Sequence, residues 1–304
     1  MQISNSGISI IICFHNSKCR LKPTLESIVD QTGLEQVNWE LILVDNASED
    51  GSMSFAQSIL GKASFNNIVC VSEHKPGLNY ARKRGIETAR YGYVLFCDDD
   101  NWLNKEYVKT AFDFLEQHEE YGVVGGNGEP VCEIEPPAWF HHYAGIYATG
   151  CRSRGNVSNV YGAGMSLRKR LLKNFKPLIE DRKGNLLTGG GDTEICDYIT
   201  SQGYHIKQLC DNTFKHFVPK ERLTLNFLKR TAHGRGYSKA QIQYQRNGMS
   251  RKELGIKYRA KQQLFKMIAA IFKLQPAIFL YEYQFLHGFY SFYREMKESK
   301  TTSC

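Results

Sequence analysis

The sequence lacks the features of a secreted, membrane-spanning or repetitive protein. A strand-like run begins near Ile8, and no basic, apolar and small-residue order typical of a secretory signal precedes it. The apolar C-terminal region is interrupted by Lys266, Lys273, Pro276 and Glu282, so no stretch reaches the ~18 apolar residues of a membrane span. Repeats and low-complexity segments are also absent. These absences predict a cytoplasmic protein without a spanning helix.

The nine cysteines lack the spacing of a zinc site, because no two of them form a C-x-x-C pair. Cys13, Cys70 and Cys97 lie in strand-like apolar runs, where cysteine behaves as a small hydrophobic residue. An odd number of cysteines in a chain of 304 residues does not favour a disulfide framework. The pattern therefore predicts thiols in a reducing compartment.

The net charge of +8 is concentrated in one segment. Residues 219–262 contain twelve Lys or Arg and two acids, so the rest of the chain is close to neutral. Such a segment suits nucleic acid, anionic lipid or phosphorylated ligands. The aromatic and aliphatic pattern of residues 264–293 indicates helices. These helices suit either an amphipathic membrane contact or a subdomain packed on the core or on a partner.

Short β-rich runs alternate with helical patterns in the first half of the chain, which predicts a mostly parallel sheet with right-handed crossovers. Residues 105–118 also have helical spacing, and residues 188–204 predict a helix with Asp192 near its N-terminus. Residues 125–164 are rich in glycine and aromatics and are predicted to be mostly loop. The predicted strands are 8–13, 41–44, 68–71 and 93–96, and the predicted helices between them are 21–31, 52–60 and 78–89.

Three consecutive carboxylates, Asp98, Asp99 and Asp100, follow the fourth predicted strand directly. Ligands of open α/β sheets bind at the carboxyl ends of the strands. Carboxylate oxygens suit Mg²⁺ or Mn²⁺, which completes its shell with water and substrate phosphates. A solvated acidic turn is the alternative interpretation of the same residues.

Seven motifs in sequence order resemble glycosyltransferase family 2, a group of inverting, nucleotide-sugar-dependent enzymes. The resemblance covers about residues 6–218 and implies an α/β fold of the GT-A type, a Rossmann-like, mostly parallel sheet flanked by helices. It implies a transferase domain at 1–218, followed by a basic and then aromatic-rich helical region at 219–304. The motifs are Ile8–Asn16, Leu25–Ile28, Leu43–Ser48, Gly77–Arg82, the acidic run from Asp98, Gly162–Lys169 and Gly190–Glu194.

The same resemblance implies a set of nucleotide contacts. His15 stands where the family often has tyrosine, and an imidazole can also stack on a base. Asp45 would accept a hydrogen bond from the base, usually uracil, and its alternative role is a turn or cap residue. Arg82 would lie beside phosphate, or could pair with an acid as an ordinary helix residue. The implied nucleotide-binding residues are Cys13, Phe14, His15, Asn16, Asp45, Gly77, Arg82, Asp98 and Asp99.

Metal and catalytic residues follow from the family's pattern as well. Asp100 and Asp98 match its D-x-D motif for Mn²⁺ or Mg²⁺, with the register of the three aspartates left open, and His216 is a candidate third ligand. Asp192 matches the catalytic base, with Glu194 in reserve, although Gly191 replaces an acid of the motif. Asp192 could also be a helix cap.

The expected activity is transfer of a sugar, UDP-linked by the family's pattern, to a glycan or lipid-linked acceptor in polysaccharide biosynthesis. A nucleotidyltransferase is disfavoured because no glycine-rich basic loop follows the first strand. The alternative is a non-catalytic protein that binds a nucleotide sugar, or nucleic acid through the basic segment. Residues 233–236 could form a basic loop over the diphosphate. Peripheral contact of residues 219–304 with the inner face of the membrane stays open.

Overall fold

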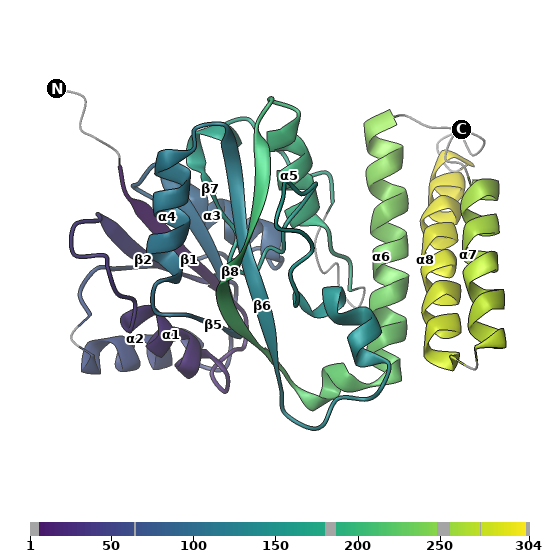
Figure 1. Cartoon of the computed structure of the whole chain (residues 1–304), viewed down its shortest axis with the longest axis horizontal. Coiled ribbons are helices and arrows are strands. Elements are labelled where there is room, and N and C mark those ends of the chain that lie inside the picture. The colour runs from purple at the N-terminus through teal and green to yellow at the C-terminus, as the bar shows by residue number, and fades with distance from the viewer. Residues whose placement is uncertain (1–5, 64, 180–186, 248–255, 274, 302–304) are drawn as a thin grey trace. The chain divides into compact units, whose positions relative to one another are not determined.

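The computed structural model describes residues 6–63, 65–179, 187–247, 256–273 and 275–301, which form two compact units. The first unit contains the described residues up to 132, together with 144–176 and 192–218. The second contains the described residues of 133–143, 177–191 and 219–304. Figure 1 shows the sheet of the first unit and the long helices of the second.

The first unit is built on one eight-stranded sheet with the order β3-β2-β1-β4-β7-β6-β8-β5. The strands from β3 to β4 in this order are parallel, as predicted, so their carboxyl ends share one edge. Strand β7 pairs antiparallel with both β4 and β6, which makes the whole sheet mixed. The strands are β1 (Ile8–Phe14), β2 (Trp39–Asp45), β3 (Ile68–Ser72), β4 (Tyr93–Asp98), β5 (Asn101–Leu103), β6 (Tyr121–Cys132), β7 (Ser166–Arg168) and β8 (His205–Val218).

Helices bury both faces of this sheet, because the side chains of a strand alternate between its two faces. Ile10 and Ile12 of β1 belong to an apolar cluster with α1, α2 and α4, whereas Ile11 packs in a second cluster with α3 and α5. All predicted helices of this half are present, with ends shifted by a few residues. They are α1 (Leu21–Val29), α2 (Ser52–Lys62), α3 (Leu78–Thr88), α4 (Tyr107–Gln117) and α5 (Gly191–Thr200).

The predicted loop at 125–164 is wrong for its first part, because residues 125–132 lie in β6. Strand β8, which pairs with β6, was not predicted either. A Cβ atom at Gly126 would collide with the Tyr107 hydroxyl, and one at Gly128 with the Ala148 carbonyl oxygen. The glycines that indicated a loop are therefore required by close packing on the strand.

Two of the aromatic residues in the predicted loop are buried. Phe140 is 1% exposed and belongs to the 3₁₀ segment η1 (Phe140–Tyr147). The ring of Tyr143 packs at a centroid distance of 4.5 Å on Tyr281, another residue of the second unit. Both side chains are therefore part of the packed interior.

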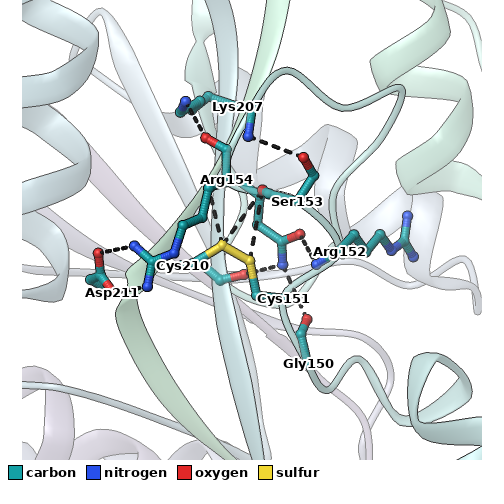
Figure 2. Close-up of a disulfide and its surroundings, with 11 residues drawn as sticks. Gly150, Cys151, Arg152, Ser153, Arg154, Lys207, Cys210 and Asp211 are labelled. Carbon is teal, nitrogen blue, oxygen red and sulfur yellow. Dashed lines mark hydrogen bonds and ion pairs between the residues drawn. A yellow bond between two sulfur atoms is a disulfide. The ribbon is translucent and has the colours of Figure 1, made fainter.

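A disulfide links Cys151, in the segment after η1, to Cys210 of β8 (Figure 2). Gln208 of β8 also holds this segment, because its Oε1 accepts from the Arg152 N–H at 2.8 Å and its Nε2 donates to the Gly150 carbonyl at 3.2 Å. The prediction of thiols is wrong for this pair. Sequence spacing could not reveal a contact between residues 59 positions apart.

The second unit contains the helices α6 (Leu225–Asn247), α7 (Ile256–Phe272) and α8 (Pro276–Thr301). Helix α8 packs on both α6 and α7 (Figure 1). Residues 233–236 lie inside α6, so the prediction of a loop there is wrong. Among the helices that the structure describes, none is long and apolar enough to cross a membrane.

Glycine allows α6 and α8 to approach closely. A Cβ atom at Gly236 would collide with the carbonyl oxygen of Phe285, which is backbone and cannot rotate away. We expect Gly236→Ala to lower the free energy of unfolding by about 3 kcal/mol, the upper end for overpacking. Urea unfolding followed by circular dichroism measures this change.

Gly61→Ala in α2 is the matched control, because a Cβ atom there meets nothing within 4 Å. This change should be neutral or stabilise the protein by up to about 1 kcal/mol, since alanine favours helix more than glycine does. Equal unfolding midpoints for Gly236→Ala and the wild type would contradict the close helix crossing.

Candidate active site

The carboxyl ends of β1, β2 and β4 bring together residues that lie far apart in the sequence. Cys13 of β1 is in register with Asp98 of β4, and Phe14 is in register with Asp45 of β2. Phe14 is buried in the core, whereas His15, beyond the end of β1, is exposed. Five of the predicted nucleotide-binding residues therefore lie at one edge of the sheet.

The turn after β2 is held by side chains at the same edge. One carboxylate oxygen of Asp45 accepts a hydrogen bond from the Ser48 N–H at 2.9 Å, which is the predicted alternative role in a turn. His15 Nδ1 donates to the carbonyl oxygen of Asn46 at 2.8 Å, and Asn16 Oδ1 accepts from the Glu49 N–H at 2.9 Å. These bonds fix the ends of β1 and β2 against each other.

Asn46 is a site residue that the sequence analysis missed. Its Nδ2 donates to the carbonyl oxygens of Glu73 and Lys75 at 3.0 and 2.8 Å, and its Oδ1 accepts from the Gly77 N–H at 2.8 Å. Gly77 precedes α3 with φ of 134°, a backbone conformation that favours glycine. One buried amide therefore shapes the loop that presents the start of α3. The signal in the sequence that could have identified Asn46 is its position, as a polar residue directly after the buried strand β2.

Asp99 faces the α1 side of the acidic turn. Its Oδ2 accepts from Arg20 Nη2 at 2.7 Å and from Nε of the same guanidinium at 3.1 Å, and it also binds the Ser17 hydroxyl. The backbone carbonyl of Asp99 accepts from the Thr24 hydroxyl at 3.0 Å. The Asp99 carboxylate thus ties the turn to the segment before α1, and the Asp99 backbone carbonyl ties it to α1 itself.

Asp98 faces Arg82 of α3. Its Oδ1 lies 3.7 Å from Arg82 Nη2, and the buried guanidinium sits 5.1 Å from the centroid of the Phe96 ring. Burial raises the pKa of Asp98, the positive charge of Arg82 opposes this, and the negative charge of Asp100 adds to it. The Asp98 side chain is still 35% exposed, so it can reach a ligand.

Asp100 is the most buried of the three carboxylates and faces β8. Its Oδ1 lies 3.6 Å from His216 Nε2, and its backbone carbonyl accepts from the Phe217 N–H at 2.9 Å. His216 is held opposite Asn101 by the pairing of β5 with β8. The distant His216 therefore reaches the acidic turn, and its role as a third metal ligand stays a prediction.

The donor set of this turn fits a divalent metal. His216 Nε2 faces Asp100 Oδ1 at 3.6 Å and is the nitrogen placed to meet a metal ion, whereas the buried Nδ1 has no hydrogen-bond partner among the described residues. Within the described part of the chain, no three His, Cys, Asp or Glu side chains form a ready metal cluster. Mg²⁺ and Mn²⁺ do not need one, because one or two carboxylates, water and phosphate oxygens complete their shell.

Asp192 lies in the first turn of α5, where a negative charge is favourable. Its Oδ2 accepts from the Gly162 N–H at 3.2 Å and its Oδ1 from the Thr193 N–H at 2.8 Å. The Thr193 hydroxyl in turn accepts from Asn159 Nδ2 at 3.3 Å. Glu194, the reserve candidate, is buried with 2% exposure, so Asp192 is the better placed acid for a substrate.

Gly162 connects the two acidic groups. A Cβ atom there would lie 2.6 Å from Arg82 Nη2, so the guanidinium packs against the Gly162 backbone, whose N–H binds Asp192. Contacts therefore run from Asp98 through Arg82 and Gly162 to Asp192. This path links the acidic turn, whose carboxylates suit a metal ion, to a carboxylate at the start of α5.

Comparison with known proteins identifies the sequences and structures that this chain resembles. The family model of glycosyl transferase family 2 matches residues 9–175. A cholesterol galactosyltransferase of Borreliella burgdorferi is 32% identical over 106 residues, which are 35% of this chain and 28% of that protein. A glucosyl-dolichyl phosphate glucuronosyltransferase of Haloferax volcanii is 24% identical over 243 residues, with 76% of each chain covered. The chain spans less than a third of the length of several other curated relatives.

Solved structures share the fold at low sequence identity. A mannosyltransferase from Pyrobaculum calidifontis, solved with GDP-Man and Mn²⁺, matches with a TM-score of 0.59 at 16% identity. The match covers 94% of this chain and 73% of that one. The predicted GT-A fold, with helices at its C-terminal end, is therefore confirmed.

Proposed function

The chain belongs to glycosyl transferase family 2, and from this premise we propose that it is an inverting transferase acting on a nucleoside diphosphate sugar. The proposed donor is UDP-linked, and the acceptor is a hydroxyl group of a glycan or a lipid-linked glycan. The proposal assigns the chemistry to residues 1–218. The observation that supports this proposal is the contact path from Asp98 through Arg82 and Gly162 to Asp192. Transfer requires the groups that bind the donor to lie close to the base that activates the acceptor.

Asp192 is the proposed base. Its carboxylate takes the proton of the acceptor hydroxyl while that oxygen forms a bond to the anomeric carbon of the sugar. The bond from the anomeric carbon to the diphosphate oxygen breaks, and the nucleoside diphosphate leaves with the electron pair. The N–H groups of Gly162 and Thr193 fix the direction of the Asp192 carboxylate before the acceptor arrives.

Asp98, Asp100 and His216 would hold the metal ion, which when bound supplies positive charge to the leaving diphosphate. Arg82 is already in place beside Asp98 and offers a second positive charge to the same group. The Mn²⁺ and GDP-Man in the mannosyltransferase of the same fold support a metal and a nucleotide sugar here.

The nucleotide is proposed to lie along the edge formed by Cys13, Phe14, His15 and Asn16. Asp45 is the proposed partner of the base, and Gly77 and Asp99 stay predicted contacts. The exposed His15 ring is fixed by its bond to Asn46, so it can stack without ordering cost.

A donor panel tests the proposal directly. Purified protein is incubated with UDP-, GDP- and dTDP-linked sugars and Mn²⁺ or Mg²⁺, and release of nucleoside diphosphate is measured. We expect one donor class to be cleaved, with inverted anomeric configuration in the NMR spectrum of the product. Retained configuration would exclude Asp192 as an inverting base, and no cleavage of any donor with any glycan acceptor would favour the non-catalytic alternative.

A further inference from the structure

Helix α7 exposes a continuous apolar face. Leu264, Phe265, Ile268 and Ile271 are 54, 74, 43 and 58% exposed. At ~100° per residue these four positions fall within about 120° of the helix circumference. Large exposed apolar side chains in one contiguous stripe mark an interaction surface, whereas single ones do not.

The opposite side of α7 packs on α8 within the same unit (Figure 1). Ala270 is buried, and Lys266 reaches Glu282 of α8 at 3.6 Å. The four exposed apolar residues of α7 are therefore not part of the packed core of this unit. No other described segment of the helical unit covers them, since the four side chains remain exposed.

The positive charge of α7 indicates which kind of surface its exposed apolar face binds. Residues 256–275 contain five Lys or Arg and no acid. Lys261 is exposed, and its position falls on the same arc as Phe265 and Ile268, while the exposed Lys273 follows the end of the stripe. Apolar side chains flanked by lysine are the pattern of helices that lie in the interface of an anionic bilayer.

We propose that this face of α7 binds the surface of a bilayer containing anionic lipids. The four apolar side chains enter the boundary between headgroups and acyl chains, and the lysines approach the lipid phosphates. A second copy of the chain fits the face poorly, because two such helices would bring lysines together. Four side chains also fall short of the roughly 20–30 residues a side in a stable protein interface. The inference does not depend on the proposed sugar transfer.

Vesicle sedimentation tests the proposal with the full-length chain. We expect wild type to bind phosphatidylcholine vesicles that contain phosphatidylglycerol, and to bind pure phosphatidylcholine vesicles much more weakly. The double change Phe265→Ser and Ile268→Ser should lower the partition coefficient by about 30-fold or more. Lys261→Gln alone should lower it by about fivefold, with the loss disappearing at high salt.

Matched controls are Ile134→Ser and Lys22→Gln, an exposed apolar residue and an exposed lysine outside α7. Neither should change vesicle binding, and all variants should keep the circular dichroism spectrum and the donor cleavage rate of wild type. Equal binding of wild type and the double variant, or no binding by wild type, overturns the proposal. So does a wild-type dimer in analytical ultracentrifugation that the double variant converts to monomer.

Discussion

Asp192→Asn is expected to lower kcat by about 10³-fold, because the amide cannot accept the proton of the acceptor hydroxyl. The amide keeps the shape of the carboxylate, and its oxygen can still accept from the Gly162 N–H. Donor binding should therefore change little, since the proposed nucleotide contacts lie on other elements. Steady-state kinetics with a saturating donor, together with calorimetry of nucleoside diphosphate binding, separate the two effects.

Glu194→Gln is the informative comparison for this prediction, because Glu194 is on the same helical turn as the base and was the reserve candidate. Asp113→Asn, at a partly exposed pair with Lys109 on α4, controls for the loss of a carboxylate elsewhere. If Glu194→Gln abolishes turnover and Asp192→Asn keeps it, the base has been assigned to the wrong residue. Unfolding midpoints of all three variants show whether a loss of activity is a loss of structure.

Asp100→Asn is expected to weaken Mn²⁺-dependent binding of nucleoside diphosphate and to lower kcat/KM by about 10³-fold, a change equivalent to roughly 4 kcal/mol. The reason is geometric, because Asp100 is the buried carboxylate that faces His216. An amide lacks the negative charge that a divalent cation requires. Calorimetric titration with and without Mn²⁺ measures the metal-dependent part of binding directly.

Asp99→Asn is the matched control, with the same substitution one position earlier. Its carboxylate pairs with Arg20 at 2.7 Å, so the change should reduce stability by about 1–3 kcal/mol and leave the Mn²⁺ dependence intact. Loss of the Mn²⁺ effect in Asp99→Asn, with retention in Asp100→Asn, would reverse the register proposed for the three aspartates. His216→Ala should lower Mn²⁺-dependent binding and kcat/KM in the same direction as Asp100→Asn but by a smaller factor. Phosphate oxygens and water can replace one neutral ligand.

The parallel half of the sheet could be predicted because β1, β2 and β4 are buried on both faces and read as largely apolar runs, such as Ile8–Phe14. Helix α5 and the place of Asp192 at its start followed from glycine punctuation and helical spacing. These signals are local, so a single sequence contains them.

The features that were missed depend on tertiary contacts. Gly126 and Gly128 look like loop residues until Tyr107 and Ala148 are placed against them. Contacts between segments far apart in the sequence also form the disulfide between Cys151 and Cys210. The same holds for the hydrogen bond by which Asn46 shapes the loop before α3. Which aspartate meets which partner was also not readable, because three identical side chains in a row have no pattern.

The acidic turn has a consequence for protein engineering, since its length matters as well as its composition. Before the turn, the pairing of Cys13 with Asp98 fixes the end of β4. After the turn, the pairing of Asn101 with His216 fixes the start of β5. Inserting one residue would shift the carboxylates relative to Arg82, Arg20 and His216 without removing any negative charge. Libraries that vary the loops of this protein should therefore keep both the three aspartates and the number of residues of this turn constant.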